Sequence, residues 1–358
     1  MKKNLLVISQ VPPPFHGSTV MTQVFLETLD SLGFSFRLVD RRFSKSLSSV
    51  GRFNLSKVAS SVGLTVRLMS GIVSVRPRQV IFFMTNRTAS FLVDVLLSEV
   101  LRLFKVPVIG YIHTQGFEAL AKKGKLWESL VRRLLGSAET LVCLSPSLEA
   151  DVRRLAPKAM LTSIGNTPFA APMPVAVEKT DAKAVLFLSN FIAEKGIDEF
   201  LDLGHRFAAA GSALRFVAAG APTDDAQLAQ LRESASWNTE IVGAVHGDSK
   251  WRLLGETSVL VFPSRYPFEA QPLVIVEAMS VGLPVVAYAI GGVGDLVIDG
   301  ETGLLLAPGD AVGFEAALKS LDESPGMVES MGSAARDRYD SNHSRASYER
   351  AWNDVLAD

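Results

Sequence analysis

The sequence predicts an α/β protein with two doubly wound, Rossmann-like domains that face each other across a cleft. A chain of 358 residues is too long for one ordinary core and suits two domains. Short apolar runs alternate with helical stretches along it, which is typical of parallel sheets covered by helices. The alternation stops at 167–183, a segment rich in proline and small residues, and then restarts.

The first half contains five apolar runs that we expect to form buried strands. They lie at 5–9, 35–39, 79–84, 107–113 and 140–145. Helical spacing over 19–32 follows the first strand, and Gly33 ends that helix. Because the order of strand, loop and helix then repeats, we expect the first domain over 1–168.

The second half repeats this order after the proline-rich segment. Its expected strands lie at 184–190, 214–220, 259–264 and 284–289. We expect the second domain over 169–341 and a carboxyl-terminal helix over 342–358 that packs back on the first domain. Ligands of such sheets bind at the carboxyl ends of the strands, so polar residues that follow strands are the functional candidates.

The net charge of −1 conceals a basic first half and an acidic second half. Residues 1–170 carry 22 Lys and Arg against 10 Asp and Glu, whereas the remainder carries 14 and 27. A basic half suggests an anionic partner, such as phosphorylated lipid, a membrane surface or nucleic acid, although a solvated face without a partner has the same composition. Aromatic and arginine residues do not interleave as in a nucleic-acid groove, so we expect no nucleic-acid partner.

Targeting and redox signals are sparse. No apolar run approaches the roughly 20 residues that a membrane-spanning helix requires. The amino end lacks the small-residue cleavage site of a signal peptide. The single cysteine, Cys143, excludes an internal disulfide and a cysteine zinc cluster. We expect a cytoplasmic protein.

The densest chemical signal lies at 258–310. Glu269 stands in a loop after an expected strand, and Glu277 stands on the helix that follows. Both carboxylates can face one small-molecule pocket, where they would accept hydrogen bonds from sugar or ribose hydroxyls. Peptide amides at the start of that helix favour phosphate. The residues at this helix start are Pro272, Leu273 and Val274. From the spacing alone, two ordinary surface charges are the alternative.

This segment closely resembles the Glu-x7-Glu region of glycosyltransferase family 4, the large retaining GT-B group of the group 1 type. The resemblance covers nearly the whole chain and is strongest at 258–310, where PS, EAM, GLPVVA, GG and GETGLL stand together. It implies that Glu269 holds the hydroxyls of the donor sugar and that Glu277 holds the nucleotide ribose.

The resemblance also implies an activity. It is the retaining transfer of a sugar from a nucleotide-diphosphate sugar to a hydroxyl of a saccharide or polyprenyl-phosphate-linked acceptor, in bacterial-type surface polysaccharide or glycolipid synthesis. The second domain would bind the donor, and the first would lie on the acceptor side. No Asp-x-Asp motif is present to hold a divalent ion, so we expect neither a metal nor a cofactor.

The segment at 187–201 resembles the family's donor-diphosphate motif, G-R-x-x-x-x-K-G. Lys195 and Gly196 match its lysine and glycine, whereas Asn190 stands in place of the arginine. A fixed cation beside the leaving phosphate lowers the barrier to transfer. Either Lys195 and the helix start suffice to bind the diphosphate, or another basic residue, such as Arg265, compensates for the missing arginine. A solvated turn lysine is the alternative.

The loop at 11–23 matches the family's loop over the donor phosphate and acceptor. Gly17 permits close backbone approach, and Ser18 and Thr19 can cap the helix that follows. His16 is better interpreted as a loop residue than as a catalyst. The G-x-G-x-x-G pattern of a dinucleotide site is absent.

His113 ends an apolar strand, so its ring is expected to face the cleft. The resemblance implies that it contacts the donor sugar near the reacting carbon and acts in catalysis, with a core histidine as the alternative. Asn166 takes the place of the family's I-P-N-G-V segment, and Gly291-Gly292 matches its G-G turn.

Of two amphipathic stretches, 121–135 combines an apolar stripe with basic residues around it, and 55–73 is apolar and sparsely charged, with no acidic residue. Such segments can lie on an anionic leaflet, which would make the protein peripheral on the inner face of the cell membrane. Packing of the apolar stripes on the domain's own sheet is the alternative.

Two other classes of function remain open. A GT-B-shaped epimerase or phosphorylase would use the same fold, and an epimerase would act on the donor without an acceptor. A non-catalytic nucleotide-sugar-binding or scaffold subunit is favoured by one feature, Asn190 in place of arginine.

Overall fold

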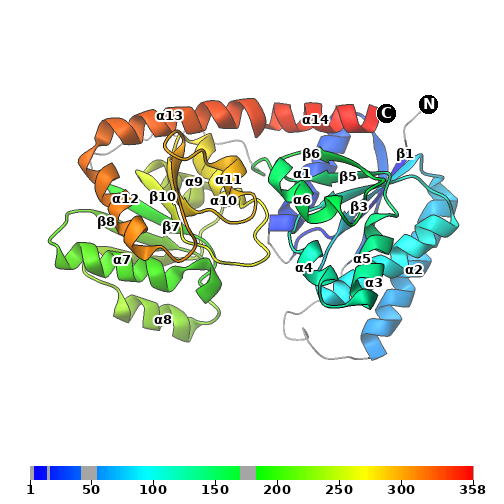
Figure 1. Cartoon of the computed structure of the whole chain (residues 1–358), viewed down its shortest axis with the longest axis horizontal. Coiled ribbons are helices and arrows are strands. Elements are labelled where there is room, and N and C mark those ends of the chain that lie inside the picture. Colours follow the sequence, from blue (N-terminus) through cyan, green and yellow to red (C-terminus); the bar gives the residue numbers. More distant parts are fainter. Residues whose placement is uncertain (1–3, 14–16, 42–54, 170–182, 358) are drawn as a thin grey trace. The chain divides into compact units, whose positions relative to one another are not determined.

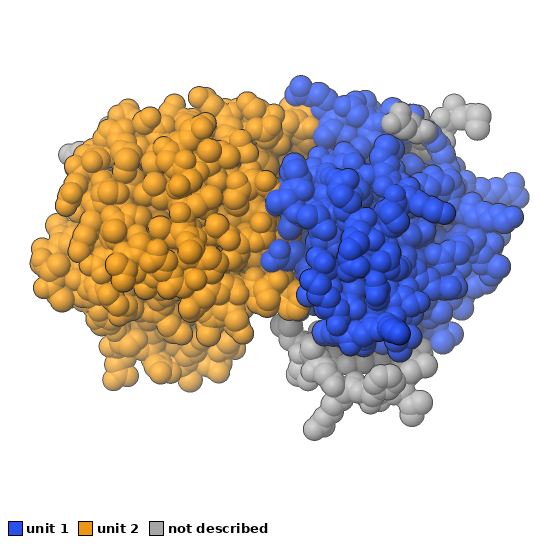
Figure 2. Space-filling model, in the orientation of Figure 1, with its two compact units in different colours: residues 1–165, 349–358 blue, residues 166–348 orange. Residues whose placement is uncertain are grey.

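The computed structural model describes residues 4–13, 17–41, 55–169 and 183–357. The chain divides into two compact units, which Figure 2 colours separately: unit 1 comprises 1–165 and 349–358, and unit 2 comprises 166–348. Each unit contains a six-stranded parallel sheet covered by helices (Figure 1). The prediction of an α/β fold with two Rossmann-like sheets is confirmed.

The sheet of unit 1 has the strand order β2-β1-β3-β4-β5-β6. Its strands are β1 (Asn4–Ser9), β2 (Ser35–Asp40), β3 (Gln79–Met84), β4 (Val108–Ile112), β5 (Thr140–Cys143) and β6 (Met160–Ser163). The central strands are almost fully buried, as parallel sheets covered on both faces require. This burial explains why the strands read as continuous apolar runs in the sequence.

The helices of unit 1 cover both faces of this sheet. They are α1 (Gly17–Ser31), α2 (Leu55–Val75), α3 (Thr88–Leu103), α4 (Phe117–Ala121), α5 (Lys125–Leu135), α6 (Pro146–Arg153) and most of α14 (Arg345–Ala357). The step from β1 to β2 runs opposite to every later step, so right-handed crossovers place α1 on one face and α2, α3, α5 and α6 on the other. Trp352 of α14 packs on Phe25 of α1 and Tyr111 of β4, with ring centroids 4.6 and 4.8 Å apart.

The sheet of unit 2 has the strand order β12-β11-β10-β7-β8-β9. Its strands are β7 (Ala184–Leu188), β8 (Arg215–Ala219), β9 (Thr239–Gly243), β10 (Val259–Phe262), β11 (Val285–Tyr288) and β12 (Gly303–Leu306). Its helices are the 3-10 turn η2 (Ala193–Lys195), α7 (Ile197–Ala209), α8 (Asp225–Ser234), α9 (Gly247–Gly255), α10 (Leu273–Ser280), α11 (Val293–Leu296), α12 (Ala311–Glu323) and α13 (Pro325–Asn342). Two apolar clusters pack against this sheet, one around Phe200 and Phe216 and the other around Ile275 and Leu260.

Three strands that the sequence did not predict all lie at sheet edges. They are β6, β9 and β12. An edge strand is covered less completely than a central one, so its sequence need not be an apolar run. Met160 of β6 is exposed, and Val242 and Glu240 of β9 are exposed too.

The expected linker and domain boundary lie at or beside residues that the structure does not describe. Most of the expected linker, 170–182, and His16 lie outside the described residues. The contacts divide the chain between Gly165 and Asn166, three residues before the expected boundary. Over the described ranges, no helix combines the length and apolar character needed to cross a membrane.

Candidate functional site

The turn that carries Lys195 lies directly against the end of β10. Lys195 ends η2, and Gly196 follows with φ +85°, a conformation that favours glycine. A Cβ atom at Gly196 would lie 2.5 Å from the carbonyl oxygen of Pro263, just beyond β10. The Lys-Gly pair of the sequence motif thus allows the turn after β7 to approach the loop after β10.

Lys195 and Glu269 form an ion pair in this place. The Lys195 ammonium donates to Glu269 Oε2, and the Ser264 hydroxyl donates to the same oxygen at 3.2 Å. The ammonium also lies 4.8 Å from the centre of the Tyr266 ring. The Lys195 side chain is 17% exposed and that of Glu269 is 10% exposed. Two predicted site residues, 74 positions apart, are therefore in direct contact and remain within reach of solvent.

The Gly291-Gly292 turn supports the loop that carries Glu269. Gly291 has φ +51°, and a Cβ atom there would lie 2.0 Å from the Glu269 carbonyl oxygen. The amide of Gly292 donates to the carbonyl of Ala270 at 2.7 Å. The absence of side chains in this turn lets two backbone segments pack closely and fix Glu269.

Asn166 holds Gln271, which lies in the same loop as Glu269. Its amide nitrogen donates to Gln271 Oε1 at 2.5 Å, and its side chain donates to the Gln271 carbonyl at 2.8 Å. The Asn166 carbonyl lies 3.1 Å from His343 Nδ1. Asn166 therefore positions the loop between β10 and α10.

Helix α10 starts at Leu273 and carries Glu277. Its N-cap residue is Pro272, which has no side-chain acceptor, and no side chain caps the helix start within the described structure. The first amides, including those of Leu273 and Val274, are the orphan donors that bind anions at helix starts. Phosphate binding by this helix start stays a prediction.

Glu277 is buried and paired with Lys250 of α9. The Lys250 ammonium donates to Glu277 Oε1 at 2.5 Å, and the two side chains are 25% and 9% exposed. Burial raises the pKa of the Glu277 carboxyl, and the positive charge of Lys250 opposes this increase. Lys250 was not predicted as a site residue. Its helix follows the edge strand β9, which the sequence pattern did not reveal.

Asn190 and Arg265 lie near the turn that carries Lys195. Asn190 is exposed just beyond β7. The Arg265 amide donates to the carbonyl of Glu194 at 2.7 Å, and its guanidinium lies 3.9 Å from Glu199 on the first turn of α7. Arg265 thus stands beside the Lys195 turn, where the sequence suggested a compensating base.

His113 follows β4 in unit 1 and belongs to an aromatic cluster. Its ring stacks on Phe83 with centroids 5.2 Å apart and meets the edge of Tyr111 at 4.0 Å. Burial lowers the pKa of His113 to about 3, so the imidazole is neutral at physiological pH. Its Nε2 atom is buried and has no hydrogen-bond partner among the described residues, which is unusual for a buried polar atom.

The loop after His113 is held rigidly within unit 1. The Asp151 carboxylate accepts hydrogen bonds from three successive amides, at 116–118, with distances of 2.8 to 2.9 Å. The Asn86 side chain donates to the Gln115 carbonyl at 2.6 Å. Gly17, the remaining predicted residue of unit 1, is exposed as the first residue of α1.

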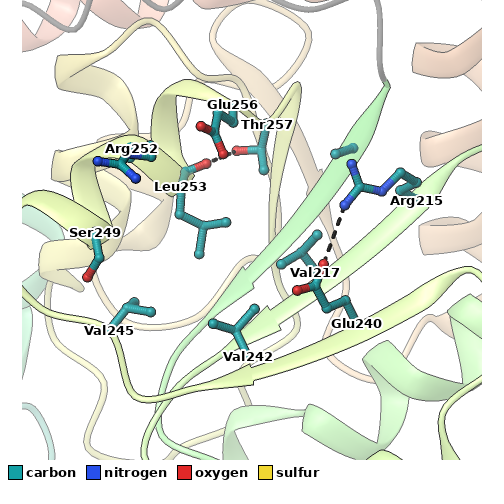
Figure 3. Close-up of a pocket in the computed structure, with 11 residues that line it drawn as sticks. Arg215, Val217, Glu240, Val242, Val245, Ser249, Arg252, Leu253, Glu256 and Thr257 are labelled. Atoms are coloured by element: carbon teal, nitrogen blue, oxygen red, sulfur yellow. Dashed lines mark hydrogen bonds and ion pairs between the residues drawn. The ribbon is translucent and has the colours of Figure 1, made fainter.

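A separate cavity of about 250 Å³ in unit 2 contains none of the predicted site residues. Figure 3 shows its lining, which includes Arg215 and Glu240, an ion pair at 3.4 Å, together with residues of α9. Ala184 and Arg215, the first residues of β7 and β8, belong to this lining. The lining thus reaches from the amino ends of β7 and β8 to Val242 and Val245 at the carboxyl end of β9.

No group of three or more His, Cys, Asp and Glu side chains is arranged to hold a metal ion in the part of the chain that the structure describes. The expected metal independence stays a prediction.

Comparisons with known proteins identify similar sequences and structures. Residues 173–338 match the family model of "Glycosyl transferases group 1". The glycogen synthase of Mycobacterium tuberculosis is 28% identical over 250 residues, which cover 66% of this chain. The match spans 59% of that relative's own length.

Solved structures match over almost the whole chain. Sucrose-phosphate synthase from Thermosynechococcus elongatus has a TM-score of 0.78 at 17% identity, covering 99% of this chain and 98% of that one. Anabaena HepE, solved in complex with UDP and glucose, has a TM-score of 0.71 at 14% identity, covering 99% of each chain. The predicted GT-B fold class is confirmed, and the resemblance to group 1 glycosyltransferases is confirmed over residues 173–338. Assignment to family 4 and retention of configuration remain predictions.

Proposed function

Because residues 173–338 match group 1 glycosyltransferases, we propose that this protein transfers a sugar from a nucleotide-diphosphate sugar to an acceptor hydroxyl. The acceptor is a saccharide or a polyprenyl-phosphate-linked saccharide, and the reaction retains anomeric configuration without a metal ion. The observation that carries the proposal is the ion pair of Lys195 and Glu269 beside β10.

The donor diphosphate replaces Glu269 as the partner of Lys195. A diphosphate carries more negative charge than one carboxylate, and the amides at the start of α10 favour the same anion. Glu269 is then released to accept hydrogen bonds from the hydroxyls of the donor sugar. Glu277, neutralised in part by Lys250, accepts them from the nucleotide ribose.

The transfer itself needs stabilisation of the leaving phosphate. The bond between the anomeric carbon and the diphosphate oxygen breaks, and a bond to the acceptor oxygen forms on the same face of the sugar. The leaving phosphate oxygen takes the proton of the acceptor hydroxyl. Lys195 stabilises the charge that develops on that phosphate, which is the largest contribution we assign to any single residue.

His113 contributes as a neutral imidazole. With a pKa of about 3 it carries no charge at neutral pH, so it acts through hydrogen bonding and not as a cationic acid. Its unpartnered Nε2 suits a hydroxyl of the donor sugar near the reacting carbon. The exposed Gly17 would let the backbone at the start of α1 approach the donor phosphate.

Two further observations bear on the proposal. The HepE structure was solved with UDP and glucose, which supports a nucleotide-sugar donor for a chain of this fold. Asn190 in place of arginine favours a non-catalytic binding subunit, but Arg265 supplies a guanidinium at the neighbouring turn. We therefore prefer the enzyme.

The test combines ligand binding with product analysis. A thermal-shift panel of UDP-, GDP-, ADP- and dTDP-sugars identifies the donor, since a ligand at one hundred times its Kd stabilises by about 2.7 kcal/mol. Transfer to saccharide acceptors is then measured with and without EDTA, and NMR of the product reports its anomeric configuration. We expect acceptor-dependent release of nucleotide, no effect of EDTA and a retained anomer. Product formed from donor alone would indicate an epimerase, and binding without turnover would indicate a scaffold.

A further inference from the structure

Two helices of unit 1 each expose a stripe of large apolar side chains. The stripe on α2 consists of Val62, Val66, Met69 and Val73, and that on α3 consists of Leu92, Leu96 and Leu103. Their exposed fractions range from 40% to 78%. Spacings of four, seven and eleven residues place each stripe along one side of its helix. We call these seven residues the apolar face.

The two stripes point to the same side of unit 1. Helices α2 and α3 follow successive strand crossovers in the same direction along the sheet, so both cover one face of it. Leu64 and Leu68 of α2 are fully buried, as are Phe91 and Leu97 of α3. The exposed stripes lie on the opposite sides of these helices and therefore point away from the sheet. Helix α3 packs against both α2 and α5, and Figure 1 shows the three helices next to one another.

The segment that carries the apolar face is strongly basic. Residues 55–135 contain 12 Lys and Arg and 4 Asp and Glu, and α2 contains no acidic residue. Asp94 is buried beside Arg41, and Glu99 is paired with Arg102 and Arg133. Exposed bases also lie near both stripes, including Arg67 on α2 and Lys105 just after α3.

We propose that the apolar face docks on an anionic lipid bilayer. Its valines, leucines and methionine would enter the boundary between headgroups and acyl chains, while Arg67 and Lys105 would bind lipid phosphates. Apolar side chains with a basic surround and few free acids suit this partner. A second copy of the chain fits less well, because two basic surfaces brought together repel each other.

Docking on lipid is independent of the proposed sugar transfer. Vesicle binding needs neither donor nor acceptor, so it can succeed or fail whatever the protein catalyses. If both proposals hold, the face would place unit 1 at the surface where a lipid-linked acceptor lies.

Co-sedimentation with vesicles tests the proposal on the full chain. Vesicles of phosphatidylcholine alone are compared with vesicles that also contain phosphatidylglycerol. We expect binding to the anionic vesicles only, and weaker binding at high salt because ions screen the attraction. The variant V66S/V73S/L96S/L103S should bind about tenfold more weakly or worse, because each serine removes apolar area that would enter the bilayer. The variant R67E/K105E should bind anionic vesicles about tenfold more weakly, because it reverses two charges that attract lipid phosphates.

Matched controls separate this face from general surface effects. V312S removes a valine that is 72% exposed on α12 of unit 2 and should leave binding unchanged. R350E reverses an exposed charge on α14 and should also bind normally. Circular dichroism checks that each variant is folded. Normal binding by a folded quadruple serine variant would overturn the proposal, as would equal binding to neutral vesicles. A dimer that this variant converts to monomer would show that a second copy covers the face, and would also overturn it.

Discussion

The carboxyl ends of the two sheets carry ion pairs of different character. In unit 1, Asp94 accepts from the Thr85 amide at 2.9 Å and lies 2.9 Å from Arg41, with its side chain wholly buried. In unit 2, the Lys195 side chain is 17% exposed and that of Glu269 is 10% exposed. The first pair links Arg41, just after β2, to Asp94 of α3, which also holds the Thr85 amide just after β3. The second lies where a ligand can reach it.

Burial therefore distinguishes the structural pair from the pair that we propose is functional. Desolvation raises the pKa of Asp94 to about 6 despite the charge of Arg41, which shows that this pair is held at an electrostatic cost. A pair that solvent can reach can exchange one partner for a ligand, provided that the hydroxyls of the ligand then satisfy the released carboxylate. On this basis we assign the donor diphosphate to unit 2, and the neutral His113 in unit 1 to hydrogen bonding.

The largest expected effect comes from breaking the functional pair. Lys195→Met should lower turnover by about 10² to 10³-fold, because it removes the cation that stabilises the leaving phosphate. The double variant Lys195→Met/Glu269→Gln should recover stability lost in the single variant, because no buried carboxylate is left unpaired, but it should not recover activity. Kinetics and thermal melts measure both effects.

The control for this pair is Lys319→Met, which breaks an exposed pair with Glu315 on α12. It should change neither turnover nor melting temperature appreciably. Normal turnover by a folded Lys195→Met variant would contradict the assignment of Lys195 to the diphosphate.

The structural pair predicts a pH dependence with a defined sign. The folded-state pKa of Asp94, about 6, exceeds the ordinary aspartate value of 3.8, so the folded protein binds more protons between these values. This carboxyl therefore adds stability as pH falls from about 6 to about 4, up to about 3 kcal/mol. Urea unfolding of the wild type and Asp94→Asn across this range should show the difference between them changing in that direction. A constant difference would contradict the burial argument.

The close approach at Gly196 predicts a difference between two glycines. Gly196 and Gly309 have φ values of +85° and +89°, but a Cβ atom would meet Pro263 only at Gly196. Both alanine variants suffer the backbone cost of about 1–2 kcal/mol. Gly196→Ala should lose a further amount of about 1–3 kcal/mol from the clash, together with activity. Equal melting temperatures for the two variants would show that the Gly196 turn moves away from Pro263 at little cost, which would contradict this prediction.

The smallest expected effect concerns Lys250. Lys250→Met leaves Glu277 buried without its cation, which further favours the protonated form of the carboxyl. Because the ribose is remote from the reacting bond, donor KM should rise about tenfold while kcat changes little. Steady-state kinetics at varied donor concentrations measures the effects on KM and on kcat separately. A fall in kcat at constant KM would place Glu277 at the chemical step.

Local sequence signals account for the parts of this architecture that could be predicted. Fully buried strands such as β1 and β10 read as apolar runs, and the Lys195-Gly196 pair marks a turn that needs glycine. The edge strands β6, β9 and β12 gave no such run, so β9 and the helix carrying Lys250 were missed. The contacts of Ser264 with Glu269 and of Asn166 with Gln271 depend on loop geometry that spacing does not specify.

The central claim is that Lys195 and its neighbours bind a diphosphate. Calorimetric titration of the wild type and Lys195→Met with UDP, GDP and ADP, and with the corresponding monophosphates, tests it directly. We predict that the wild type binds one diphosphate more tightly than its monophosphate and that the variant loses this preference while remaining folded. An unchanged preference in the variant would contradict the claim.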